Sequence, residues 1–259
     1  SLTMQGSGIA FIGQGKGATR IAVNHNAGDP GIRIANLAVP GRIERCGVFA
    51  MTLVHAVTPA PAVQLTDMIR AEYVRGLAIM GVDVENGKAT ARVSGCSDVA
   101  IDSVDWRVTE GTDTNRHGVI IDHTTATYAG AGEKFGRRIS VSRCRFADDG
   151  YVPNSGSFRF ASGVDFVCGQ LVTLDEVVVA GARNGVILDR STGQVAAGAP
   201  VELSDITIKG GTFKPVAKGI MTDNTGGGMV VGGLDIECNT LEGNLGSTRG
   251  IEFSAGVVM

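Results

Sequence analysis

A short repeated pattern constrains the fold of this 259-residue chain more than any other feature. Each copy begins with glycine and continues with apolar or threonine residues at alternate positions. Five segments carry the pattern, at residues 118–122, 163–167, 185–189, 219–223 and 250–254, and they begin 45, 22, 34 and 31 residues apart. A period of two with many β-branched residues is typical of strands rather than helices. The sequence therefore predicts recurring short strands.

A second series of strand-like segments alternates with the first. Its members begin at Val99, Ile139, Leu174, Val201 and Met229. Repeats of about 20 to 45 residues, each with at least two short strands and glycine or asparagine turns, are typical of a parallel β-solenoid. One coil cannot bury its apolar face alone, but coils stacked about 4.8 Å apart can. We therefore expect an all-β fold, with residues 65–74 as the one stretch that could form a helical turn.

Composition excludes several other classes of protein. The chain has 38 glycines but only seven prolines and no triplet repeat, which excludes collagen. No apolar run approaches the roughly 20 residues of a membrane-spanning helix. A net charge of -3 argues against duplex nucleic acid as a partner. A β-sandwich would contain more aromatic residues than 5%, and a left-handed solenoid would show a six-residue period, which is absent.

The five cysteines predict free thiols rather than disulfides or a metal site. Their number is odd, they are evenly spread, and no two form a Cys-x-x-Cys pair. Cys96, Cys144 and Cys238 lie in apolar strand-like runs, where a thiol behaves as a small buried hydrophobe. Free thiols also indicate folding in a reducing compartment such as the cytoplasm.

Residues 6–21, with the sequence GSGIAFIGQGKGATRI, resemble the first coil of the pectate-lyase-like right-handed parallel β-helix superfamily, especially phage tailspikes and related polysaccharide depolymerases. Residues 204–213 resemble its later coils. The glycines at 13–17 could also cradle a phosphate, but a strand pattern follows them rather than a helix, so we expect a tight turn and no cofactor.

The resemblance implies a single right-handed β-helix domain over residues 1–259 that binds, and can depolymerise, a host surface polysaccharide. It further implies a homotrimer, with other spike or tail proteins as partners, on a virion surface or outside the cell. Two alternatives stay open: a non-catalytic structural β-helix of a trimeric spike, and a free bacterial polysaccharide lyase or hydrolase. Because neither end carries a capping helix, we expect a fragment of a longer chain or a partner that covers the ends.

Strand alternation assigns two faces to the repeated segments. Valine or isoleucine after each glycine points inward, and so does the residue two positions later. The outward positions then carry five carboxylates. We expect Asp165, Asp189 and Asp223 to be catalytic, and Asp122, His123, Glu252 and Arg190 to bind substrate. The alternative is that these polar residues only solubilise the sheet.

Spacing favours one pair of carboxylates for acid-base chemistry. Asp165 and Asp189 would lie about 8 Å apart on neighbouring coils, which suits an inverting glycosidase, whereas Asp189 and Asp223 at about 5 Å would suit a retaining one. His117 and His123 flank the first segment and could act as a base or a sugar ligand. No metal ligands cluster in the sequence. One tryptophan and three tyrosines leave few rings for sugar stacking.

Overall fold

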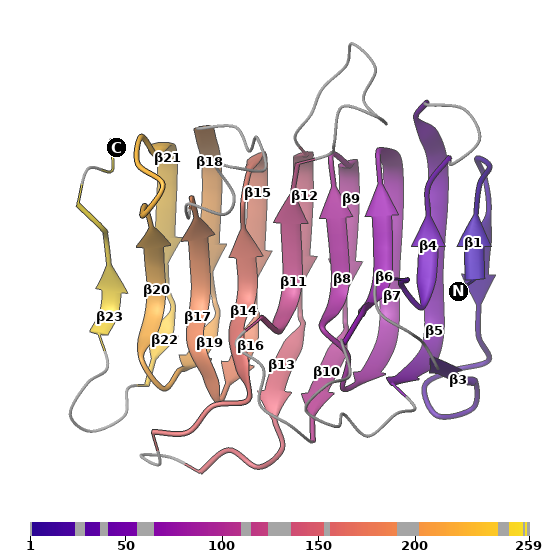
Figure 1. The fold of residues 1–259 in the computed structure, drawn as a ribbon, viewed down its shortest axis with the longest axis horizontal. Helices are drawn as coiled ribbons and strands as arrows, with labels where there is room; N and C mark the ends of the chain where they lie inside the picture. Colours follow the sequence, from indigo (N-terminus) through magenta and orange to yellow (C-terminus); the bar gives the residue numbers. More distant parts are fainter. Residues whose placement is uncertain are drawn as a thin grey trace.

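The structure, a computed structural model, describes residues 2–23, 29–36, 41–55, 65–109, 115–123, 136–152, 156–190, 202–242, 249–255 and 257. All regular elements in these ranges are β-strands, and every strand pair is parallel. Strands of successive coils lie side by side from β1 at one end to β23 at the other (Figure 1). The predicted all-β parallel β-helix is confirmed.

Two sheets enclose the interior. One sheet has nine strands: β1 (Leu2–Met4), β4 (Ile32–Ile34), β6 (Asp67–Glu72), β8 (Ala89–Ser94), β11 (His117–Asp122), β14 (Phe160–Phe166), β17 (Ala182–Asp189), β20 (Lys218–Asp223) and β23 (Arg249–Glu252). The five predicted glycine segments are neighbours in this sheet, and Val119, Val164 and Val186 pair directly. Segments up to 45 residues apart in sequence are therefore adjacent, as a solenoid requires.

The second sheet has fourteen strands and wraps the rest of each coil. They are β2 (Ala10–Ile12), β3 (Arg20–Val23), β5 (Ile43–His55), β7 (Val74–Glu85), β9 (Ser97–Asp102), β10 (Asp105–Val108), β12 (Arg137–Ser142), β13 (Arg145–Asp148), β15 (Gly169–Asp175), β16 (Val178–Ala180), β18 (Glu202–Lys209), β19 (Thr212–Lys214), β21 (Val230–Glu237) and β22 (Thr240–Leu241). The second series of predicted strands corresponds to β9, β12, β15, β18 and β21. The stretch at 65–74 is strand, not helix, because β6 and the start of β7 pair with the next coil.

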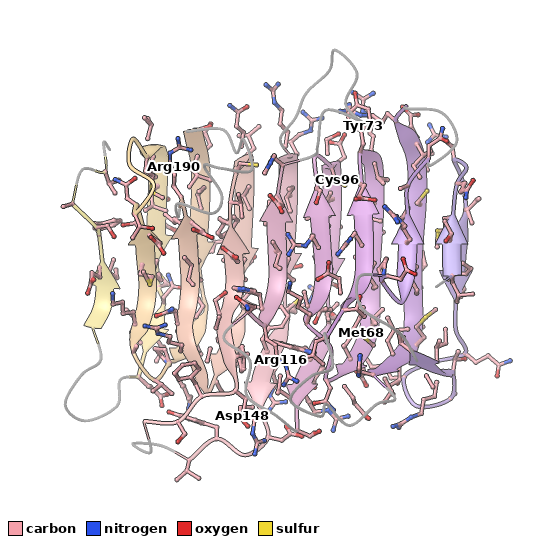
Figure 2. All side chains as sticks on the ribbon, viewed as in Figure 1. Met68, Tyr73, Cys96, Arg116, Asp148 and Arg190 are labelled. Carbon is pink, nitrogen blue, oxygen red and sulfur yellow. The ribbon has the colours of Figure 1, made fainter. Side chains whose placement is uncertain are left out.

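The interior is a continuous apolar core running along the coils. Side chains predicted to point inward, such as Ile121, Phe166 and Leu188, are fully buried. Met68 and Cys96 are also among the buried side chains (Figure 2). Ile251 pairs in register with the buried Ile220, but Ile251 and Phe253 are themselves 43% and 42% exposed. β23 pairs on one side only, so no further described coil covers them.

A column of glycines bends the nine-stranded sheet. Gly163, Gly185 and Gly219 stack on neighbouring strands. A Cβ on Gly185 would collide with the carbonyl oxygen of Gly219 and lie 2.9 Å from Cδ1 of Phe213. The glycine therefore faces the interior. The residue before it faces outward, whereas the residue after it faces inward like the glycine, so the strict alternation of sides is broken at this position. Close approach of the backbone, not positive φ, requires glycine here.

The cysteines are free thiols, as predicted, and four are buried. Cys238 is exposed, contrary to the prediction. It occupies the single left-handed residue that joins β21 to β22, with φ 51°. The equivalent corners of earlier coils hold Arg143 and Glu176, also at positive φ and outside the core. An apolar run next to a corner therefore does not place its last residue inside.

The glycines at 13–17 form a turn, as predicted. It connects β2 to β3, both of which pair with β5. Gly15 and Gly17 have positive φ, and Lys16 forms an ion pair of 2.7 Å with Asp83. No helix in the described ranges is long and apolar enough to cross a membrane.

Candidate functional site

A hollow of about 480 Å³ lies on the outer face of the nine-stranded sheet. Strands β8, β11, β14, β17 and β20 contribute its lining. The central row runs across these strands in register, from Arg92 through Ile120, Asp165 and Ile187 to Met221. All three residues predicted to be catalytic, Asp165, Asp189 and Asp223, line it. The repeat thus brings the carboxylates together from three coils.

Asp165 lies in the floor of the hollow and is only 4% exposed. Isoleucines flank it on both neighbouring strands. Burial, followed by the charge of Asp189, raises its pKa well above the ordinary value, and the positive charge of Arg92 only partly opposes this. Its Oδ1 atom has no hydrogen-bond partner among the described residues. Asp165 therefore keeps its proton to a higher pH than an ordinary aspartate does.

His117 lies beside this acid. Its Nδ1 atom is 2.8 Å from the Ser162 hydroxyl oxygen and 3.6 Å from Oδ2 of Asp165. Burial, then the positive charges of Arg92 and Lys88, lower the pKa of His117 to about 3. The imidazole is therefore neutral at neutral pH.

The two remaining carboxylates lie toward the carboxyl ends of their strands. Asp189 on β17 and Asp223 on β20 are direct partners in register. Asp189 is two residues beyond the partner of Asp165, so the strand spacing puts these two about 8 Å apart. Oδ1 of Asp223 accepts a hydrogen bond of 3.1 Å from the amide of Thr225. The hollow thus combines a buried carboxyl group whose pKa is raised with two further carboxyl groups on adjacent strands.

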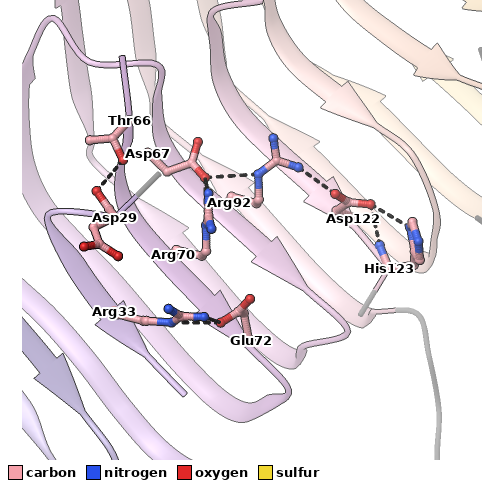
Figure 3. Close-up of polar contacts among 9 residues, drawn as sticks. All are labelled: Asp29, Arg33, Thr66, Asp67, Arg70, Glu72, Arg92, Asp122 and His123. Atoms are coloured by element: carbon pink, nitrogen blue, oxygen red, sulfur yellow. Dashed lines mark hydrogen bonds and ion pairs between the residues drawn. The ribbon is translucent and has the colours of Figure 1, made fainter. Parts of the chain in front are cut away.

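An ion-pair network holds Arg92 at the edge of the hollow (Figure 3). Arg92 donates to Oδ2 of Asp67 at 3.1 Å and to Oδ2 of Asp122 at 2.6 Å. Asp67 also accepts from Arg70, at 2.7 Å. Burial disfavours the ionised form of Asp122, but hydrogen bonds from His123 and the charge of Arg92 outweigh it and lower the pKa of Asp122. Arg92 is thereby fixed and largely neutralised.

The four residues predicted to bind substrate are not among the lining residues. Asp122 and His123 contact each other at 2.8 Å within the network of Arg92. Glu252 accepts from Lys218 at 2.7 Å. Arg190, at the upper edge in Figure 2, is buried and donates to the carbonyl oxygen of Gly227 at 2.7 Å. Two of these contacts still position lining side chains, Arg92 and Lys218.

Sequence reasoning named His117 as a possible base or sugar ligand, but it missed two polar lining residues in the same row, Asn184 and Lys218. His117, Asn184 and Lys218 each directly precede a glycine of the bend and project into the hollow. Strict alternation places them on the same side as the inward valine or isoleucine two positions later. The recurrence of a polar residue before each glycine was the available signal. This recurrence shows which face the polar residues are on only when the bend at the glycines is known.

Comparison with known proteins agrees with this fold. No family model matches the chain, and no curated protein matches it. The catalytic domain of a GH87 alpha-1,3-glucanase in complex with tetrasaccharides aligns with 92% of this chain at 11% identity and a TM-score of 0.52. This chain spans 51% of that one, about half its length. At this identity the likeness shows a shared parallel β-helix fold and no more.

Two further solved structures align less closely. The Streptococcus pneumoniae surface protein and adhesin PfbA matches 97% of this chain and 90% of its own, at 9% identity and a TM-score of 0.46. The A-module of an Azotobacter vinelandii mannuronan C-5 epimerase matches 96% and 85%, at 13% identity and a TM-score of 0.28. The tailspike resemblance of the sequence stays a prediction beside these findings.

Proposed function

We propose that the hollow binds a polysaccharide and hydrolyses its glycosidic bonds. The observation that carries this proposal is the buried Asp165 carboxyl group, which keeps a proton and lies next to the strand that bears Asp189. Glycoside hydrolysis requires this combination of a protonated acid and a nearby carboxylate. The protein named an alpha-1,3-glucanase, in complex with tetrasaccharides, is consistent with a carbohydrate ligand for this fold.

The mechanism follows from the spacing. Asp165 donates its proton to the glycosidic oxygen as the bond from that oxygen to the anomeric carbon breaks. Asp189 removes a proton from a water molecule whose oxygen bonds to the same carbon from the opposite side. A separation of about 8 Å leaves room for that water, so the anomeric configuration is inverted. Solvent then carries the proton from Asp189 back to Asp165, which completes the cycle.

The location and assembly of the protein are proposed from its sequence. The tailspike-like residues 6–21 support placing the protein on a virion or another extracellular surface, as a homotrimer that acts on a host glycan. A non-catalytic spike is the alternative. The described lining residues include no phenylalanine, tyrosine or tryptophan, and the single tryptophan, Trp106, is in the core, so the hollow lacks the large rings that usually stack on sugars. Binding without shortening of the glycan would favour that alternative.

The test is a depolymerisation assay on a panel of bacterial capsular and O-antigen polysaccharides. We expect the chain length of one glycan to fall with release of reducing ends and without unsaturated products, and NMR to show inversion at the anomeric carbon. Unsaturated products would indicate a lyase and contradict the assignment. Absence of cleavage of any glycan that the protein binds would contradict hydrolysis altogether.

The rate should also depend on pH in a defined direction. Asp165 acts in its protonated form, and its pKa is raised by burial and by Asp189. We therefore expect kcat/KM to fall as pH rises through this raised pKa, well above the range of an ordinary aspartate. A profile that falls already near pH 4, where ordinary aspartates titrate, would show that a different, solvated acid donates the proton.

A further inference from the structure

The charges around the hollow are unevenly distributed. Asp189 and Asp223 lie toward the carboxyl ends of the strands. Lys88 and Arg183 lie at the opposite edge, in a row that the backbone hydrogen bonds define: His117 N to Lys88 O, Ala161 N to Arg116 O, and Ala217 N to Arg183 O. Ala161, which lies between the two cations next to Arg183, has a short side chain, and Arg116 in the same row is buried.

Lys88 and Arg183 have no carboxylate partner among the described residues. Other lysines and arginines of the chain do: Lys16 contacts Asp83, Lys218 contacts Glu252, and Arg92 contacts Asp67 and Asp122. Arg183 instead lies over the ring of Phe158, with 5.9 Å between the guanidinium carbon and the ring centroid. Both cations are therefore available to an anion that enters the hollow.

The separation of the two unpaired cations indicates the form of the anion. Arg92 and Lys218 also line the hollow, but Asp67, Asp122 and Glu252 already neutralise them. Lys88 and Arg183 are three strands apart, which corresponds to about 14 Å at ordinary strand spacing. A single small anion cannot contact both, but an extended chain with repeated charges can.

We propose that the ligand of the hollow is an acidic polysaccharide whose sugar carboxylates are bound by Lys88 and Arg183. The inference rests on the proposed function, because it assigns the class of glycan to that site. The planar guanidinium of Arg183 can bind a carboxylate through two hydrogen bonds, and Lys88 supplies a point charge. A sugar carboxylate held at this edge would also disfavour ionisation of Asp165, and so would help that group to act as an acid.

The test compares two small matched probes by NMR titration of the protein. Methyl β-D-glucuronide carries the carboxylate, and methyl β-D-glucopyranoside is its neutral counterpart; inorganic sulfate controls for charge alone. We expect the glucuronide to shift the amide signals of His117, Asn184 and Lys218, and to bind at least about tenfold more tightly than the glucoside or sulfate. The double variant Lys88→Gln/Arg183→Gln should lose at least about tenfold in affinity for the glucuronide only.

A control variant with the same change of charge is Arg143→Gln/Lys209→Gln, on the fourteen-stranded sheet, and it should bind the glucuronide like the wild type. Any of four results would overturn the inference. These are equal affinity for glucuronide and glucoside, affinity for sulfate as high as that for glucuronide, unchanged glucuronide affinity of the Lys88/Arg183 double variant, and no binding of either sugar. Cleavage of a neutral glycan that depends on Asp165 would overturn it and leave the proposed hydrolysis intact. Binding of glucuronide without cleavage of any acidic glycan would support the acidic ligand and contradict the proposed hydrolysis.

Discussion

Asp165→Asn should reduce kcat/KM for glycan cleavage by about 10²- to 10⁴-fold, the usual cost of removing a general acid. Asparagine has nearly the shape of the protonated carboxyl group but cannot donate its proton to a leaving oxygen. The measurement is the initial rate of reducing-end release on the glycan that the wild-type protein cleaves. Asp235→Asn, on the exposed face of β21, removes a carboxylate far from the hollow and should leave the rate unchanged.

The same substitution should not destabilise the fold, which separates catalysis from folding. The pKa of Asp165 is raised in the folded protein, so the proton is bound more tightly there than in the unfolded chain. The stability contributed by this proton is complete below the unfolded pKa, and it is lost as pH rises through the folded pKa. Asparagine does not ionise, so at neutral pH we expect the variant to unfold at the same or a higher urea concentration. Wild-type activity of Asp165→Asn would remove this residue from the mechanism, and a lower urea midpoint would contradict the direction of the pKa shift.

Gly185→Ala should lower the free energy of unfolding by about 3 kcal/mol, as expected for an added group in a close-packed interior. The new methyl group would collide with the backbone oxygen of Gly219 and with the ring of Phe213, and neither the stacked strand nor the buried ring can move away freely. The urea midpoint, compared at equal m-value, measures this loss.

Gly232→Ala on β21 is the matched control. An added Cβ there would lie 3.7 Å from Cβ of Ser204, an ordinary contact, and this glycine does not have positive φ. We expect its unfolding free energy to stay within about 0.5 kcal/mol of the wild type. If both variants unfold at the same urea concentration, close packing at the bend is not what requires glycine in this column.

Much of the candidate site could be predicted because strand alternation is a local property. The period of two put Asp165, Asp189 and Asp223 on one face, and the repeat put them on neighbouring coils, which is where they lie. The polar side chains at the opposite end of the hollow could not be assigned to this face in the same way. His117, Asn184 and Lys218 face the hollow because the glycine column bends the sheet, and the bend arises from contacts between coils rather than from the residues of one strand.

The sequence by itself determined the strands, their parallel stacking and the faces of most side chains, because apolar alternation and glycine spacing are patterns along the chain. The tertiary structure alone decided which outward residues are buried. Asp165 is surrounded by isoleucines from the coils before and after its own, so its proton affinity depends on chain segments 22 to 45 residues away. It also decided that Cys238 lies outside, because this residue is itself the left-handed corner, where the alternation of strand faces is interrupted. The burial of a side chain and the charges around it depend on several stacked coils, so the sequence of one coil does not determine them.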